Sequence, residues 1–255
     1  MISIQDLKIK LFADGADLKV IAQLSKHPLI NGFTTNPTLM KKSGVTDYKT
    51  FADEALKIVP HLPISFEVFS DDFSEMEEQA MEIASWGKNV YVKIPVSNTK
   101  GEFSGPLIRQ LVSAGVQVNV TALMTVRQVE QVLKYLSNKT RSYVSVFAGR
   151  VADTGRDPMP LMAEAVRVLK PNPGAELIWA SPRELLNIFQ ADSVGCHIIT
   201  ATHDVLAKLA LVGKDLDIFS LDTVKMFYED AASAKFAIKI NLQKPAKILQ
   251  DKEVA

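Results

Sequence analysis

Residues 90–121 read VYVKIPVSNTKGEFSGPLIRQLVSAGVQVNVT, and a short apolar run stands at each end of this stretch. Alternate residues of an extended strand point to opposite faces. The first run therefore places its valines and isoleucine on one face and Tyr91 and Lys93 on the other. The second run, 116–121, sets three valines against Gln117, Asn119 and Thr121. We predict two strands that each carry an apolar face and a polar face.

The same kind of run recurs eight times along the chain. The predicted strands are 9–14, 30–35, 64–68, 90–94, 116–121, 143–147, 176–181 and 196–200. Amphipathic helical patterns lie between them, for example at 74–86, 126–136, 159–169 and 182–190. Eight alternating units favour parallel pairing and a closed barrel. An open doubly wound sheet is the competitor, but no glycine-rich fingerprint follows any strand. We predict an α/β fold, a (β/α)8 TIM barrel.

The chain length and the last segments define the expected domain organisation. A chain of 255 residues fits one large domain, which we predict to span 1–255. Segments 221–241 and 245–251 read as extra C-terminal helices, so the part from about residue 221 lies outside the barrel repeat.

The composition excludes several classes of function. There are 29 basic and 29 acidic residues, which leaves no electrostatic footprint for nucleic acid or an anionic membrane. No apolar run is long enough to span a bilayer, and the charged start does not resemble a signal peptide. The single cysteine, Cys196, suits a reducing compartment, so we expect a cytoplasmic protein. The four histidines lack metal-site spacing, and we expect neither a metal nor a cofactor.

The polar faces of the predicted strands hold the candidate catalytic residues. A lone lysine late in a strand is usually a snorkelling surface residue. Lys93 instead shares its face with Tyr91 and would have Glu67 and Asn119 as neighbours. Desolvation inside a barrel favours a neutral amine that can attack a ketone. Asp14 ends the first strand; it is either a turn residue or a proton-transfer group, because Asp17 is the better helix cap.

Other candidates follow the strand ends. Asn36, in the Asn-Pro sequence after the second strand, reads as a turn residue or as a donor to a substrate hydroxyl. Arg150 and Arg183 follow the sixth and seventh strands. With Ser181 and a helix start predicted at Pro182, they would form a phosphate cradle. Further candidates weigh less: Arg156 is a third basic group of this region, and Cys196 and His197 read as core and loop residues, because a strand sends them to opposite faces.

The motifs together resemble the transaldolase family, including its short members and the related fructose 6-phosphate aldolases. The resemblance runs from Phe12 to about Ile240. Its motifs are FADGAD, TTNPT, SFEVF, VYVKIPV, VNVTALMT, SVFAGR and WASPRE, in family order. It implies carbohydrate metabolism of the pentose phosphate type, sugar phosphates as partners, no cofactor, and a homo-oligomer.

The resemblance also implies roles for individual residues. Lys93 matches the Schiff-base lysine, Asp14 the proton-transfer aspartate, and Glu67 the acid–base carboxylate that handles the catalytic water beside Thr121. The positions that match substrate contacts are Asn36, Asn119 and Ser145 for hydroxyls, Arg150, Ser181 and Arg183 for the phosphate, and Phe147 above the reacting carbons.

Two positions separate the activities within the family. Aldolase-type members resemble one another in having Gln in place of Glu67 and Tyr in place of Phe147, so the resemblance implies a transaldolase. A phenol at position 147 could orient water to release the three-carbon unit, whereas phenylalanine cannot. The chain departs from the family at Val146, at Pro182 and in the polar loop 151–158. A fructose 6-phosphate-type aldolase and an enzyme for another anionic ketose therefore remain alternatives, as does a barrel that only binds sugar phosphates.

Overall fold

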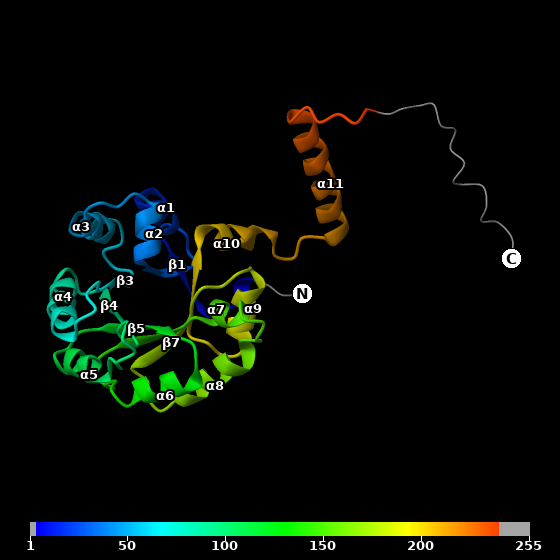
Figure 1. Cartoon of the computed structure of the whole chain (residues 1–255). Coiled ribbons are helices and arrows are strands. Elements are labelled where there is room, and N and C mark those ends of the chain that lie inside the picture. The colour runs from blue at the N-terminus through cyan, green and yellow to red at the C-terminus, as the bar shows by residue number, and fades with distance from the viewer. Residues whose placement is uncertain (1–3, 240–255) are drawn as a thin grey trace, which may run out of the picture. The chain divides into compact units, whose positions relative to one another are not determined.

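The computed structural model describes residues 4–239, and its eight parallel strands form a closed barrel in chain order from β1 to β8 (Figure 1). The strands are β1 Lys10–Asp14, β2 Ile30–Thr34, β3 Ile64–Glu67, β4 Val90–Pro95, β5 Val118–Leu123, β6 Ser142–Val146, β7 Ala175–Trp179 and β8 Ile198–Thr202. Every predicted strand overlaps one of these, and the predicted α/β barrel is confirmed.

Helices follow the strands and form the outer ring of the barrel in Figure 1. They are α1 Leu18–Leu24, α2 Pro37–Lys42, α3 Tyr48–Ile58, α4 Phe73–Ser85, α5 Gly105–Ser113, α6 Val126–Leu133, α7 Ala148–Ala152, α8 Met159–Leu169, α9 Leu186–Ser193 and α10 His203–Ala207. Short 3-10 turns occur at Ile4–Asp6 and Lys208–Leu211. Side chains cap several helix starts, as Asp17 does for α1 and Asp72 for α4, which satisfies amide groups that have no partner within the helix.

The two faces of each strand have different surroundings, as the alternation predicts. Val92 and Ile94 of β4 are fully buried in the layer between the sheet and the helices. Inside the barrel, Tyr91 and Tyr143 stack with ring centroids 3.9 Å apart, and Phe12 meets Tyr143 edge-on. Aromatic and aliphatic side chains thus fill part of the lumen. Polar groups gather at the carboxyl ends of the strands, the end of such barrels at which active sites lie.

The helix predicted at 182–190 begins later than expected, because α9 starts at Leu186. Ser181 has a left-handed backbone with φ 58°, which turns the chain sharply after β7. The side chain of Asn187 then accepts hydrogen bonds from the amides of Arg183 and Glu184. Pro182 therefore lies in a turn, and the helix start predicted at this position was wrong.

The turn at Ser181 packs closely against Gly149 of α7. A Cβ atom at position 149 would lie 1.5 Å from the carbonyl oxygen of Ser181, so only glycine fits there. The Gly149 amide also donates to the Ala180 carbonyl at 3.3 Å. The loops after β6 and β7 are thereby held together.

The chain divides into two compact units, one ending at Val212 with the barrel and one beginning at Gly213. The second unit contains α11, Leu216–Ser233, which is capped by Asp215 and closed by Lys235 at φ 55°. A C-terminal helix beyond the barrel was predicted, although at 221–241. The segment 245–251 lies outside the described residues, and the single domain over 1–255 stays a prediction. Within residues 4–239 no helix is long and apolar enough to cross a membrane.

Candidate active site

A cavity of about 610 Å³ opens at the carboxyl ends of the barrel strands. The structure brings the catalytic and binding candidates of the sequence to its wall, with the exception of Arg156. These are Asp14, Asn36, Glu67, Lys93, Asn119, Thr121, Ser145, Phe147, Arg150, Ser181 and Arg183. Thr34, Thr200, Thr202 and Asp204 add further polar groups to the lining.

Lys93 lines this cavity with only 6% of its surface exposed. Its ammonium donates to the Glu67 carboxylate at 2.9 Å and to the Thr35 carbonyl at 2.8 Å. The barrel register places Glu67 directly beside Lys93 on the neighbouring strand. Moving an ammonium out of water into a protein interior costs on the order of several kcal/mol unless the group is paired and hydrogen-bonded. The two acceptors offset that cost and fix the position of the nitrogen.

Asp14 ends β1 and accepts a hydrogen bond from the Thr34 hydroxyl at 2.8 Å and one from the Asn36 amide at 3.4 Å. Burial raises the pKa of this carboxyl, and the nearby Lys93 charge and these hydrogen bonds reduce the rise only in part. Asp17, not Asp14, caps α1, which confirms that part of the sequence analysis. Asp14 is therefore a carboxyl without a structural task in the first helix, and its environment favours retention of a proton.

Asn36 serves two neighbours at once. Its side-chain oxygen accepts from the Leu39 amide as the N-cap of α2, so the Asn-Pro sequence begins a helix here and not the simple turn that was one of the two predictions. Its side-chain nitrogen points to Asp14. The cap thus fixes the orientation of the amide toward the cavity.

A line of polar side chains crosses the lumen beside Lys93. The Ser145 hydroxyl donates to the Asn119 oxygen at 2.7 Å, and the Asn119 nitrogen donates to the Ser65 hydroxyl at 3.1 Å. The buried Thr121 hydroxyl has no hydrogen-bond partner among residues 4–239. It lies next to Ala122, whose φ of 65° marks an irregularity in the pairing of β5 with β6. Such irregularities often redirect a side chain at an active site.

The two arginines lie near the mouth of the cavity in different settings. The Arg150 guanidinium lies 5.2 Å from the centroid of the Phe147 ring. Arg183 forms a two-bond ion pair with Asp153, in which its Nε donates at 2.9 Å. About half of each side chain in this pair is exposed, so the pair is weak and an anion can compete for it. Because Pro182 does not start a helix, these side chains, and not a helix terminus, supply the positive charge. Arg156 bonds Thr154 and does not line the cavity.

Two further threonines, Thr34 and Thr200, were not predicted as site residues, and their hydroxyls lie 2.5 Å apart beside Asp14. Thr34 stands directly opposite Asp14 in the β1–β2 register, so its position in the TTNP motif was the available signal. Thr200 shares no local pattern with the other candidates. Only closure of the barrel between β8 and β1 brings it to Asp14.

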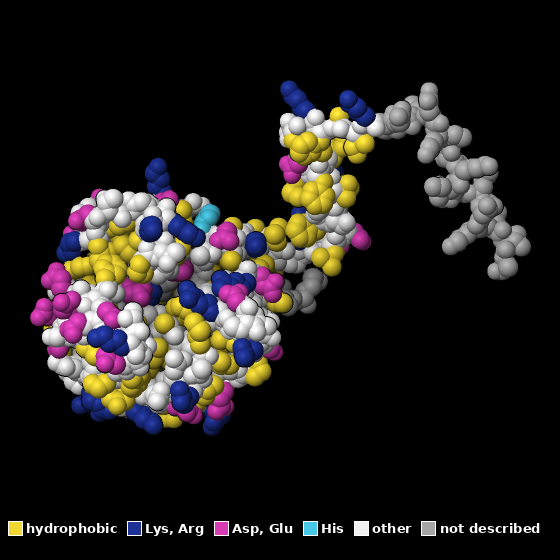
Figure 2. Space-filling model, viewed as in Figure 1, with side chains coloured by type: hydrophobic (Ala, Val, Ile, Leu, Met, Phe, Trp, Pro, Cys, Tyr) yellow, Lys and Arg dark blue, Asp and Glu magenta, His cyan; other side chains and the backbone are white. Residues whose placement is uncertain are grey.

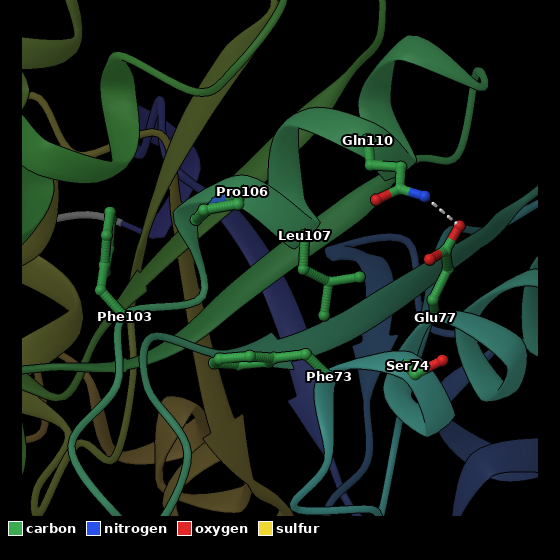
Figure 3. A pocket seen from close by; sticks show the side chains of 7 residues that line it. All are labelled: Phe73, Ser74, Glu77, Phe103, Pro106, Leu107 and Gln110. Atoms are coloured by element: carbon green, nitrogen blue, oxygen red, sulfur yellow. Dashed lines mark hydrogen bonds between the residues drawn. The ribbon is translucent and has the colours of Figure 1, made fainter.

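A second hollow lies between α4 and α5 (Figure 3). It is lined by Phe73, Ser74, Glu77, Phe103, Pro106, Leu107 and Gln110. Gln110 and Glu77 bond each other across its rim. No buried amine or carboxylate pair stands in this lining, so the chemistry belongs to the barrel cavity. Within the described residues no cluster of three or more His, Cys, Asp or Glu is arranged to hold a metal ion.

The chain is similar in sequence to proteins of one known family. The family model described as Transaldolase/Fructose-6-phosphate aldolase matches residues 11–255. A protein named "Probable transaldolase" from Dehalococcoides mccartyi is 35% identical over 79% of this chain and 90% of its own. A protein of the same name from Streptococcus agalactiae is 33% identical over 84% of this chain and 97% of its own.

A solved structure from Burkholderia cenocepacia, titled as that of "a putative lyase/mutase", matches with a TM-score of 0.55. The match covers 80% of each chain at 12% identity. At that identity the likeness extends to the fold alone.

The environment of Asp14 leads to a prediction about stability. Because its pKa is raised, the folded protein holds this proton to higher pH than the unfolded chain does. The free energy of unfolding then falls as the pH rises from about 4 through the raised pKa. Asp14→Asn removes the buried charge and should raise the free energy of unfolding at pH 7.

Urea unfolding at pH 7 and at about pH 3.5 tests this expectation, since the gain should vanish at the lower pH. Asp17→Asn is the control, because asparagine caps a helix as well as aspartate does and should change little at either pH. A loss of stability at pH 7 in Asp14→Asn would contradict the prediction.

Proposed function

Because the chain belongs to the transaldolase/fructose-6-phosphate aldolase family, we propose that it is a transaldolase that works through a Schiff base on Lys93. The donor would be a ketose phosphate such as fructose 6-phosphate or sedoheptulose 7-phosphate. The acceptor would be an aldose phosphate, and the unit transferred would be dihydroxyacetone. The observation that carries the proposal is the buried Lys93 amine, paired with Glu67 in a cavity that also holds the Asp14 carboxyl.

The first step joins the donor to the enzyme. The neutral Lys93 amine attacks the ketone carbon, and the resulting carbinolamine loses its hydroxyl as water to give the imine. Glu67, whose oxygen lies 2.9 Å from the Lys93 nitrogen, is placed to accept the amine proton and to return a proton to the departing hydroxyl. The Thr121 hydroxyl, which has no partner among the described residues, would hold that water.

The second step breaks a carbon–carbon bond. Asp14 accepts the proton of the hydroxyl on the fourth carbon while the bond between the third and fourth carbons breaks. The electron pair moves toward the iminium nitrogen, so that an enamine remains on Lys93 and an aldose leaves. The raised pKa of Asp14 suits a group that must take up this proton and return it. An acceptor aldehyde reverses the sequence, and hydrolysis of the imine releases the new ketose.

The substrate chain would be held on both sides of the reacting carbons. Asn36, Asn119 and Ser145 offer amides and a hydroxyl to its hydroxyl groups. Arg150, Arg183 and Ser181 would receive the phosphate at the mouth of the cavity. A phosphate that binds Arg183 would compete with Asp153 for its guanidinium.

Two positions favour transfer over simple aldol cleavage. Phe147 is half-buried beside the lumen cluster, and its ring offers no hydroxyl to orient water. The enamine would therefore persist until an aldehyde arrives. Glu67 is the second position, since it supplies a carboxylate where aldolase-type members have an amide. A fructose 6-phosphate-type aldolase and an enzyme for another anionic ketose are the competing functions.

We also propose that the protein is a homo-oligomer. No residue of α11 is buried, and many of its apolar side chains are exposed; Figure 2 shows yellow side chains along the visible face of this helix. Leu216 is 79% exposed, Phe227 63% and Tyr228 76%. A helix with this many exposed apolar side chains requires a covering surface, and we assign that role to a second copy. A cytoplasmic location is part of the proposal, supported by the buried free thiol of Cys196.

Lys93→Met should abolish turnover and leave the fold intact, because methionine keeps the volume of the side chain and removes the nucleophile. Loss of a covalent route should lower kcat by several powers of ten. The decisive experiment is borohydride reduction with fructose 6-phosphate, followed by mass analysis of the peptide that contains position 93. The wild type should gain a reduced three-carbon or six-carbon adduct there, and the variant none.

Assays of the wild-type enzyme with and without an acceptor distinguish a transaldolase from an aldolase. Release of the three-carbon unit from donor alone should be slow, and reaction should be fast once glyceraldehyde 3-phosphate is added. Donor cleavage as fast as transfer would replace the transaldolase by an aldolase. If the wild type is active but position 93 carries no reduced adduct, the proposed Schiff-base mechanism is contradicted.

Arg183→Ala should raise the KM for glyceraldehyde 3-phosphate by about tenfold or more, since a charge-assisted hydrogen bond contributes roughly 1.5–3 kcal/mol. The KM for unphosphorylated glyceraldehyde should change little. Arg156→Ala is the control, because its side chain does not line the cavity. Steady-state kinetics with both acceptors decides the point, and equal losses on the two would contradict a phosphate role.

Phe227→Glu should disrupt the assembly, since it places a charge in the apolar surface that we expect to be covered. Light scattering after gel filtration should show a smaller species than the wild type. Asp230→Asn, on the same helix, is the matched control and should leave the assembly unchanged. A monomeric wild type at micromolar concentration would contradict the oligomer.

A further inference from the structure

The β2–β3 pairing ends abruptly next to the catalytic lysine. The Phe33 amide donates to the Pro63 carbonyl at 2.8 Å, and the Thr35 amide donates to the Ser65 carbonyl at 3.2 Å. In a regular parallel ladder the next bond would run from the Glu67 amide to the Thr35 carbonyl. That bond is replaced, because both of these groups have other partners.

The Thr35 carbonyl accepts the Lys93 ammonium at 2.8 Å. The Glu67 amide donates instead to the phenol oxygen of Tyr48 at 2.7 Å, and the same phenol donates to the Glu67 carbonyl at 3.0 Å. One side chain from α3 therefore satisfies both backbone groups of Glu67. Buried backbone groups require hydrogen-bond partners. Without the phenol, the Glu67 amide would lack one, and the Thr35 carbonyl is the acceptor that a regular ladder offers.

The ring of Tyr48 is fixed by its own surroundings. It meets Phe66 edge-on at 6.1 Å between centroids and Trp86 at 5.5 Å, and it packs against Phe69 at 4.6 Å. Burial raises the pKa of the phenol, so the hydroxyl keeps its proton and remains both donor and acceptor. The hydroxyl is thus held at one place relative to β3.

We propose that Tyr48 is a positioning residue for the reaction at Lys93. Its phenol takes the place of strand β2 at Glu67, which leaves the Thr35 carbonyl free to hold the lysine nitrogen and fixes the Glu67 carboxylate beside it. Tyr48 does not touch the substrate and acts through Glu67 and Thr35. The inference rests on the proposed function, because it concerns the amine that forms the Schiff base.

Tyr48→Phe tests the inference, since it keeps the ring and removes only the hydroxyl. We expect kcat for transfer to fall about tenfold with the KM for the donor changed less than about twofold, because alignment and not binding is affected. The rate of borohydride trapping at position 93 should fall by the same factor. Tyr135→Phe, which removes a phenol from a ring that packs on Phe103 away from β3, should leave both rates unchanged.

A double-mutant cycle with Glu67→Gln separates positioning from a purely structural role. If Tyr48 acts through the carboxylate, Tyr48→Phe should slow trapping less than about threefold in the Glu67→Gln background, compared with about tenfold in the wild-type background. A lower melting temperature with unchanged kcat, or an equal effect in both backgrounds, would overturn the inference. Failure of trapping in the wild type would overturn the proposed function itself, whereas equal trapping by wild type and Tyr48→Phe would overturn only the role of Tyr48.

Discussion

The buried ion pair between Lys93 and Glu67 is the constraint on which the cavity depends. An ammonium placed inside a barrel loses its hydration, and neither one carboxylate nor one carbonyl alone replaces it. The structure supplies both, from β3 and from the end of β2. The pairing of β2 with β3 is accordingly shorter than that of β3 with β4. The same interruption that stabilises the charge leaves the amine accessible from the cavity.

The rest of the site follows from barrel closure. Residues that share lumen parity on successive strands come to one level, as Glu67, Lys93 and Asn119 do through their pairing. Asp14 reaches the same cavity from β1, and its hydroxyl neighbours Thr34 and Thr200 come from the strands on either side of it. Aromatic side chains fill the lumen beside this polar level, so that the charged groups face a limited volume.

Much of this arrangement could be predicted because strand alternation is a local property. Five residues of sequence suffice to show that Tyr91 and Lys93 share one face of their strand. The register of a closed barrel then brings that face beside the polar residues of the neighbouring strands. Contacts that depend on distant packing could not be predicted. Tyr48 comes from a helix, and Asp153 reaches Arg183 across two loops. A helix start was predicted at Pro182 because proline is common at the first position of a helix. The left-handed Ser181 and the hydrogen bond to Asn187 form a turn there instead. The start of α11 was predicted too late: the cap is Asp215, and Leu216, Ile218 and Phe219 already belong to the helix.

The contact between Gly149 and Ser181 joins helix α7, which carries Arg150, to the turn that precedes Arg183. The two segments pack so closely that the space between them does not admit even a methyl group at position 149. The two segments therefore form a single exchangeable module. In the proposed function both segments receive the substrate phosphate, so a graft of one loop from a relative would have to bring the other loop with it.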